Sequence, residues 1–407
     1  MKIGMTFHKH APPRPGPPFF TIKIPSRISS RPGSFKLVFY VPQDYKSTPV
    51  EQRFPVVVNF HGGGFTLGTG TDDARWAKSV VETTKAVLVS VEYRLAPEYP
   101  FPVGVEDGTD AVLYLAAHAD ELRLDPHRIA LSGFSAGGNY AFTVPLMLHD
   151  LQIGSGKRTL KREQGQAPPS GLTNQSNASA SLQVGGPSIE PIASSDALPL
   201  PRKSVSPTEF EISQQISPLT ITAIVAFYPA VDFRIPRSVK KLTNPQPACN
   251  LPDILTDLFD NSYMNDGYTT VPLDFADPYL SPAAASDALL AAAYPDSIVL
   301  YTCEYDMLNA EGVAFGERLK GKGIGKTVKG GLIKGVAHAF DRKPDLYRWP
   351  VEAERCYREA CAELNVVFRQ EGREGVGVEE RRQLEDVERV ERFEDGVGDG
   401  ARGDTRS

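Results

Sequence analysis

The chain has 407 residues, of which 41% are hydrophobic and 9% aromatic, enough to bury one large core or two modest ones without help from metals or disulfides. Its formal net charge of -6 lacks the surplus of clustered Lys and Arg on which phosphate binding depends. We therefore expect no nucleic-acid partner and predict a small-molecule ligand instead.

The cysteines and the lengths of the apolar runs indicate the cellular compartment. The four cysteines are few for this length, lack the spacing of zinc ligands, and do not form the framework of a secreted disulfide protein, so reduced thiols and no metal are expected. No signal-peptide core follows Met1, and no run approaches the ~20 apolar residues that cross a bilayer. These features predict a cytoplasmic protein without a transmembrane segment.

The N-terminal third begins with a segment rich in Pro, Ser and basic residues, for which an irregular conformation is expected over residues 1–34. Short, almost wholly apolar runs follow, and such runs are typical of strands buried on both faces. A stretch with helical spacing at 103–119 lies among them. The expected strands are residues 35–41, 55–60, 86–91 and 128–132.

The remaining two thirds alternate in the same way around one insertion. A helix runs from Ser135 to about Leu151, and residues 154–217 are so dense in Ser, Pro, Gln and Gly that a disordered, low-complexity insertion is expected. Beyond it the pattern predicts strands at 219–227, 297–302 and, more weakly, 331–333; a partly helical lid at 253–268; a closing helix at 352–368; and a charged tail at 370–407.

Strands separated by helix-length segments indicate right-handed crossovers between parallel neighbours. The fold class is therefore α/β, with a mainly parallel central sheet flanked by helices and a small cap. Residues 35–153 and 218–369 together form the expected catalytic domain.

The most informative motif is Gly133-Phe134-Ser135-Ala136-Gly137, between an expected strand and an expected helix. This is a G-x-S-x-G motif in the context that a nucleophilic serine requires. The glycines leave room for a tight strand-to-helix turn, and the turn exposes the hydroxyl of Ser135. A glycine-rich turn without chemistry is the alternative for this motif alone.

A second motif, His61-Gly62-Gly63-Gly64-Phe65, directly follows the strand predicted at 55–60. Consecutive glycines allow backbone amides to turn inward, where they can stabilise the negative charge of a tetrahedral intermediate. We expect Gly63, Gly64 and Ala136 to be the oxyanion donors. A phosphate loop is disfavoured because no Lys-Ser/Thr pair follows the glycines.

A serine nucleophile needs a histidine base and a carboxylate that orients the histidine. Of the seven histidines only His338 follows Ser135 on a late loop, so it is the expected base. Asp306 directly follows the strand at 297–302 and is the preferred acid, because open α/β sheets gather their sites at this edge. Glu304 is the main rival, and Glu311, Asp232 and Asp341 are other competing carboxylates.

Taken together, these motifs resemble the hormone-sensitive-lipase-like branch of the α/β-hydrolases, which is marked by H-G-G-G and G-x-S-A-G-G. The similarity runs from about Val56 to Phe368 apart from the insertion, and includes Glu92 to Glu98, Phe101-Pro102, Glu106-Asp107, Asp306-Met307-Leu308 and His338-Ala339-Phe340. The resemblance implies the α/β-hydrolase fold, ester hydrolysis without a cofactor, Asp306 rather than Glu304 as the acid, and a structural role for His61 in holding the glycine loop.

This family usually carries a longer helical N-terminal region that roofs the site, so the resemblance implies either a reduced roof here or an incomplete start. The expected function is cleavage of carboxylic esters of small to medium acyl chains through an acyl-enzyme on Ser135, with Phe65, Phe134 and Tyr228 as substrate contacts. A thioesterase, an amidase, a lactone hydrolase of a biosynthetic pathway and a non-catalytic ligand-binding relative are the alternatives. The sequence leaves the oligomeric state open.

Overall fold

The computed structural model describes residues 15–154, 217–264, 272–342 and 350–374. The expected insertion and all but the first residues of the expected charged tail therefore lie outside the described residues, as does the end of the expected lid, 265–268. Within the described ranges, no helix is both long enough and apolar enough to cross a membrane.

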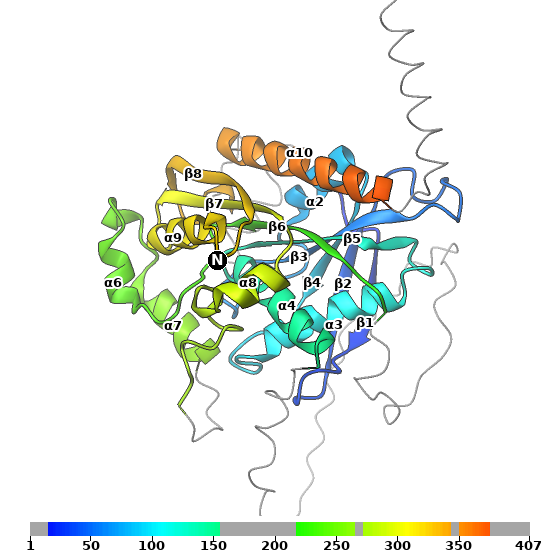
Figure 1. Ribbon diagram of the computed structural model, residues 1–407. Coiled ribbons are helices and arrows are strands. Elements are labelled where there is room, and N and C mark those ends of the chain that lie inside the picture. Colours follow the sequence, from blue (N-terminus) through cyan, green and yellow to red (C-terminus); the bar gives the residue numbers. More distant parts are fainter. Residues whose placement is uncertain (1–14, 155–216, 265–271, 343–349, 375–407) are drawn as a thin grey trace, which may run out of the picture.

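A central eight-stranded sheet organises the described chain, with strand order β1-β2-β4-β3-β5-β6-β7-β8 (Figure 1). β1 and β2, and β2 and β4, pair antiparallel, while all later neighbours pair parallel. The prediction of a mainly parallel α/β sheet is therefore confirmed. The strands are β1 Phe20–Pro25, β2 Ser34–Tyr40, β3 Phe54–Phe60, β4 Val87–Glu92, β5 Leu124–Phe134, β6 Ile221–Phe227, β7 Ser297–Tyr305 and β8 Thr327–Ala337.

The prediction of an irregular segment over residues 1–34 is wrong for β1. This strand pairs antiparallel with β2, so that Ile22 lies opposite Leu37 and Ile24 opposite Phe35. Its apolar residues alternate with exposed polar ones, and only Ile24 is fully buried. An edge strand with one half-buried face needs few apolar residues, which is why its signal is weak beside that of the central strands.

Helices cover both faces of the sheet (Figure 1). α2 (Ala74–Thr84) and α10 (Val351–Glu374) pack together on one face. The other face carries α3 (Val103–Ala117), α4 (Ala136–Gln152), α8 (Asp287–Ala293) and α9 (Asn309–Lys320). The remaining elements are α6 Arg237–Leu242, α7 Asp253–Met264 and the short 3-10 turns η1 Pro247–Cys249, η2 Pro282–Ala284 and η3 Phe340–Arg342.

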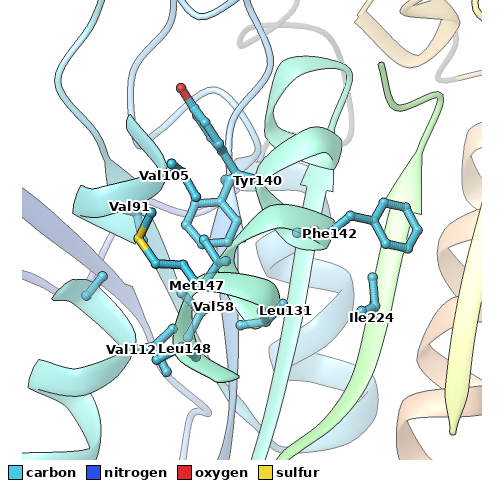
Figure 2. Close-up of a cluster of buried hydrophobic side chains, with 14 of the residues drawn as sticks. Val58, Val91, Val105, Val112, Leu131, Tyr140, Phe142, Met147, Leu148 and Ile224 are labelled. Carbon is cyan, nitrogen blue, oxygen red and sulfur yellow. The ribbon is translucent and has the colours of Figure 1, made fainter. Parts of the chain in front are cut away.

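The larger hydrophobic core lies between the sheet and α3 and α4. Every residue of β3 is buried, as expected for a strand that is covered on both faces. Side chains from neighbouring strands meet those of the two helices in one continuous cluster (Figure 2). The residues labelled there are Val58, Val91, Val105, Val112, Leu131, Tyr140, Phe142, Met147, Leu148 and Ile224. This core supports the carboxyl ends of β3 and β5, from which the two glycine motifs emerge.

The chain reverses direction at Ser135. β5 ends at Phe134, and α4 leads back from Ala136 to the amino edge of the sheet, where it ends at Gln152. β6 runs parallel to β5 and begins at Ile221, at the same amino edge. The undescribed residues 155–216 therefore leave and rejoin the described fold at the edge opposite Ser135.

Three buried carboxylates gather in the first half of α3, where they hold the N-terminal segment. Asp107 pairs with the buried Arg94 at 2.8 Å, and Asp110 accepts hydrogen bonds from the backbone N–H groups of Arg27 and Ile28. Glu106 is only 3% exposed, and its Oε2 atom has no hydrogen-bond partner among the residues that the structure describes. Burial raises the pKa of Glu106 to about 7, and the neighbouring carboxylates act in the same direction.

The raised pKa of Glu106 predicts a stability that falls as the pH rises. Between the ordinary pKa of 4.5 and about 7, the folded chain binds the proton more tightly than the unfolded chain does, so ionisation opposes folding. Glu106→Gln is therefore expected to exceed the wild type in free energy of unfolding at pH 8, by about 1–3 kcal/mol, and to match it near pH 4, below the ordinary pKa. Urea titrations at both pH values measure this, with the exposed Glu98→Gln as control. Equal pH dependence in wild type and Glu106→Gln would contradict the prediction.

Candidate active site

Ser135 stands at the turn between β5 and α4. Its φ of 54° and ψ of −114° are strained for a residue with a side chain, and its backbone N–H donates to the carbonyl of Phe227 at 2.9 Å. A Cβ atom at Gly133 would overlap the backbone of Gly137, and one at Gly137 would overlap the carbonyl of Phe60. The glycines of the motif are therefore required by close backbone packing, which holds the hydroxyl of Ser135 at the carboxyl edge of the sheet.

Three of the predicted side chains meet at this edge. Ser135 Oγ lies 2.9 Å from His338 Nε2, and His338 Nδ1 lies 2.6 Å from Asp306 Oδ2. His338 follows β8 and Asp306 follows β7, so the end of a different strand positions each residue. Asp306 is 3% exposed, and its Oδ1 accepts the N–H of Leu308 at 3.0 Å. A carboxylate held in this way can fix the histidine tautomer whose free nitrogen accepts the serine proton.

The competing carboxylates have other partners. Glu304 accepts the backbone N–H of Gly335 at 2.7 Å, and Asp232 pairs with Arg234 at 2.7 Å. Glu311 pairs with the buried Lys240 at 2.5 Å. Asp341 accepts the hydroxyl groups of two tyrosines, Tyr228 and Tyr357. Asp306 alone among the carboxylates considered is hydrogen-bonded to the imidazole in the described part of the chain.

The glycine loop follows β3 and lies beside Ser135, because a Cβ atom at Gly62 would contact the side chain of Ser135. Gly63 and Gly64 have φ angles of 130° and 59°, which disfavour residues with a side chain. The ring of His61 stacks on Tyr93 with 4.2 Å between ring centroids, and its Nδ1 lies 2.9 Å from the carbonyl of Gly62. Burial lowers the pKa of His61 to about 4, so the ring is neutral and acts as a fixed support for the loop.

α7 covers this loop. A Cβ atom at Gly64 would overlap the ring of Phe259, so this ring rests directly on the glycine. One turn later the ring of Tyr263 stacks on Phe65, with 3.8 Å between centroids and 6° between planes. The carbonyl of Tyr263 accepts the N–H of Phe101 at 2.9 Å. The described part of the expected lid is thus a helix packed over the predicted oxyanion loop.

A family model described as the alpha/beta hydrolase fold matches residues 57–181 and 207–342. The chain belongs to the alpha/beta hydrolase fold family. This match covers more than half of the chain and includes Ser135, Asp306, His338 and the glycine loop. The prediction of this fold is thereby confirmed.

Relatives of this chain include proteins named as esterases and lipases. Carboxylesterase NlhH of Mycobacterium tuberculosis is 41% identical over 102 residues, which are 25% of this chain and 32% of that protein. Human hormone-sensitive lipase is 41% identical over 91 residues, 22% of this chain and 8% of that protein. The matched segments thus span a third or less of these relatives' own length. The resemblance to the hormone-sensitive-lipase-like branch is confirmed.

A solved structure extends the likeness to the whole fold. The hyperthermophilic esterase of the archaeon Pyrobaculum calidifontis superposes on this chain with a TM-score of 0.59 at 25% sequence identity. The superposition covers 90% of this chain and 88% of the esterase.

The three predicted substrate contacts occupy different surroundings. Phe65 lies beneath α7, at the glycine loop. Phe134 is 1% exposed and stacks on Phe227 with 4.5 Å between centroids, in the core on the α10 side. This burial argues against the predicted substrate contact of Phe134, because its side chain leaves β5 toward the core before the turn at Ser135. Tyr228 is also buried, and its hydroxyl is bound to Asp341.

The sequence did not predict the positions of two residues near the site. Phe259 lies in the segment predicted to be a partly helical lid, but no pattern shows which loop a helix covers. Asn139 follows Gly138 in α4, and its buried amide donates to the carbonyls of Ala230 and Leu280, at 2.9 Å each. A polar residue in the first, buried turns of α4 was the available signal for Asn139.

Gly64→Ala tests the predicted oxyanion loop. The added methyl group would collide with the ring of Phe259 in a backbone conformation that alanine disfavours, so the loop or the ring must shift and the loop amides lose their native geometry. We expect kcat for a short p-nitrophenyl ester to fall about 10²- to 10³-fold, the loss typical of one missing oxyanion donor. Gly325→Ala is the control, since Gly325 also has a positive φ but open space around it. A Gly64→Ala enzyme with wild-type kcat would contradict the assignment.

Proposed function

We propose that this protein is a serine hydrolase that cleaves carboxylic esters of small to medium acyl chains through an acyl-enzyme on Ser135. The observation that carries the proposal is the continuous hydrogen-bonded line from Ser135 through His338 to Asp306, beside the glycine loop. The esterase and lipase names of its relatives support the same chemistry.

In the first half-reaction His338 Nε2 takes the proton of Ser135 as Oγ attacks the ester carbonyl. Negative charge then develops on the carbonyl oxygen, and the amides of Gly63, Gly64 and Ala136 are the proposed donors that stabilise it. His338 returns the proton to the leaving alcohol, and the acyl group remains on Ser135.

In the second half-reaction a water molecule takes the place of the alcohol. His338 accepts its proton as the oxygen attacks the acyl-enzyme, and then returns the proton to Ser135 Oγ as the bond to the acyl carbon breaks and the acid is released. Asp306 stabilises the imidazolium in both halves. Each step therefore uses only groups of this chain.

A fluorophosphonate probe followed by p-nitrophenyl esters of increasing chain length tests the proposal. Covalent labelling of Ser135, located by mass spectrometry of the digested protein, and turnover of short to medium esters are expected. Thioester, anilide and lactone substrates with matched acyl groups distinguish the ester hydrolase from the alternatives. If one of them has a higher kcat/KM than the ester, its bond type is the substrate class of the protein. A folded protein that neither reacts with the probe nor hydrolyses any of these substrates would be a ligand-binding relative, and the proposal would fail.

A further inference from the structure

Tyr228 lies beside both the nucleophile turn and the proposed base. It directly follows β6, where the preceding residue, Phe227, accepts the backbone N–H of Ser135. Its own N–H donates to the carbonyl of Tyr301 at 2.8 Å, and its φ of 41° is unusual for a tyrosine. The ring is 2% exposed and packs nearly perpendicular to the imidazole of His338, with 4.9 Å between centroids and 66° between planes. The ring thus forms an aromatic wall in direct contact with the imidazole.

The hydroxyl of Tyr228 fixes this ring from behind. It donates to Asp341 Oδ1, while Asp341 Oδ2 accepts the hydroxyl of Tyr357 from α10 at 2.8 Å. Asp341 is 2% exposed, so both of its oxygens are taken by phenol donors that replace water. The position of the Tyr228 ring is therefore set by a buried carboxylate only three residues beyond His338.

The segment that carries His338 and Asp341 is itself anchored to the sheet. The next residue, Arg342, pairs with Asp73, which accepts the side-chain amide of Asn59 at 2.8 Å. Asn59 in turn accepts the hydroxyl of Ser132 on β5 at 2.8 Å. This buried chain of polar contacts ties η3 to β3 and β5, and gives Asp341 a fixed place from which to hold Tyr228.

We propose that Tyr228 is a positioning residue that keeps the imidazole of His338 in line with both Ser135 and Asp306, and that Asp341 holds Tyr228 in this role. The two hydrogen bonds of the imidazole lie along the ring edge and do not prevent it from tilting out of plane. The ring of Tyr228 packs against the imidazole and restricts that tilt. The inference rests on the proposed function, because it assigns a role within the same triad.

Two variants test the role of Tyr228. Tyr228→Phe keeps the wall and removes the bond to Asp341, whereas Tyr228→Leu also removes the aromatic wall. We expect kcat for a p-nitrophenyl ester to fall about 10-fold in the first and about 100-fold in the second, the range caused by small misplacements of catalytic groups, with KM within two-fold of the wild type. Tyr294→Phe is the matched control, because the hydroxyl of this buried tyrosine has no hydrogen-bond partner in the described structure.

Proton NMR supplies a readout that does not depend on turnover. The Nδ1–H proton of His338, hydrogen-bonded to Asp306, should give a strongly downfield signal that broadens or shifts in both Tyr228 variants and stays unchanged in Tyr294→Phe. An unaltered signal in both variants overturns the inference, and so does a raised KM with unchanged kcat, which would make Tyr228 a substrate contact. A wild-type protein without hydrolytic activity would contradict the proposed function alone, since the imidazole signal still decides the role of Tyr228.

Discussion

Replacing Ser135 by alanine is expected to lower kcat for a short p-nitrophenyl ester by roughly a million-fold, the loss typical of removing a triad nucleophile. Without Oγ no acyl-enzyme can form, and His338 has no hydroxyl from which to take a proton. The variant should still fold, because the backbone N–H of Ser135, and not its side chain, anchors the turn to Phe227. The rate of ester hydrolysis measures the loss of activity, the melting temperature shows that the variant folds, and the fluorophosphonate probe shows whether the nucleophile is present.

Ser79→Ala is the matched control for the nucleophile. The hydroxyl of Ser79 donates only to the carbonyl of Arg75 within α2, on the face of the sheet that carries α10. It should therefore keep wild-type turnover and labelling. Substantial activity in a folded Ser135→Ala protein would remove the nucleophile assignment and the acyl-enzyme with it.

Asp306→Asn is expected to reduce kcat by about 10⁴-fold with little change in the fold. An asparagine has nearly the same shape, but its amide can donate to Nδ1 and thereby favour the tautomer whose Nε2 carries a proton. Such an imidazole cannot accept the proton of Ser135. Initial-rate kinetics with a short ester measure the loss.

Glu304→Gln is the paired variant, since Glu304 stands two residues earlier in the same stretch and was the rival acid. Its carboxylate accepts the N–H of Gly335, and no hydrogen bond joins it to His338. We expect kcat within a few-fold of the wild type. A larger loss in Glu304→Gln than in Asp306→Asn would transfer the role of the acid to Glu304.

The central strands were predictable because burial on both faces requires continuous apolar runs. The prediction missed β1 because this antiparallel edge strand is half-buried on one face and needs few apolar residues. The opposite edge strand, β8, was recognised only at residues 331–333, although it extends from Thr327 to Ala337. Glycines and exposed lysines interrupt its apolar pattern, because most of its side chains face solvent.

The order and motifs of Ser135, Asp306 and His338 were readable in the sequence because each follows a strand, and parallel strands bring their carboxyl ends to one edge. The direction in which the neighbouring aromatic side chains point could not be predicted from the sequence. Phe134 and Tyr228 are both aromatic residues next to the turn, yet each points into a buried cluster. The contact between Tyr228 and Asp341 joins residues 113 positions apart, and no local pattern encodes it.

The place where α4 ends and β6 begins has a consequence for engineering. Chain added between Gln152 and Ile221 is attached on the side of the sheet remote from the reacting groups. A tag or a foreign domain inserted at this junction is therefore expected to leave the geometry around Ser135 unchanged. The end of α4 and the start of β6 offer an attachment point that is separated from Ser135 by the length of the sheet.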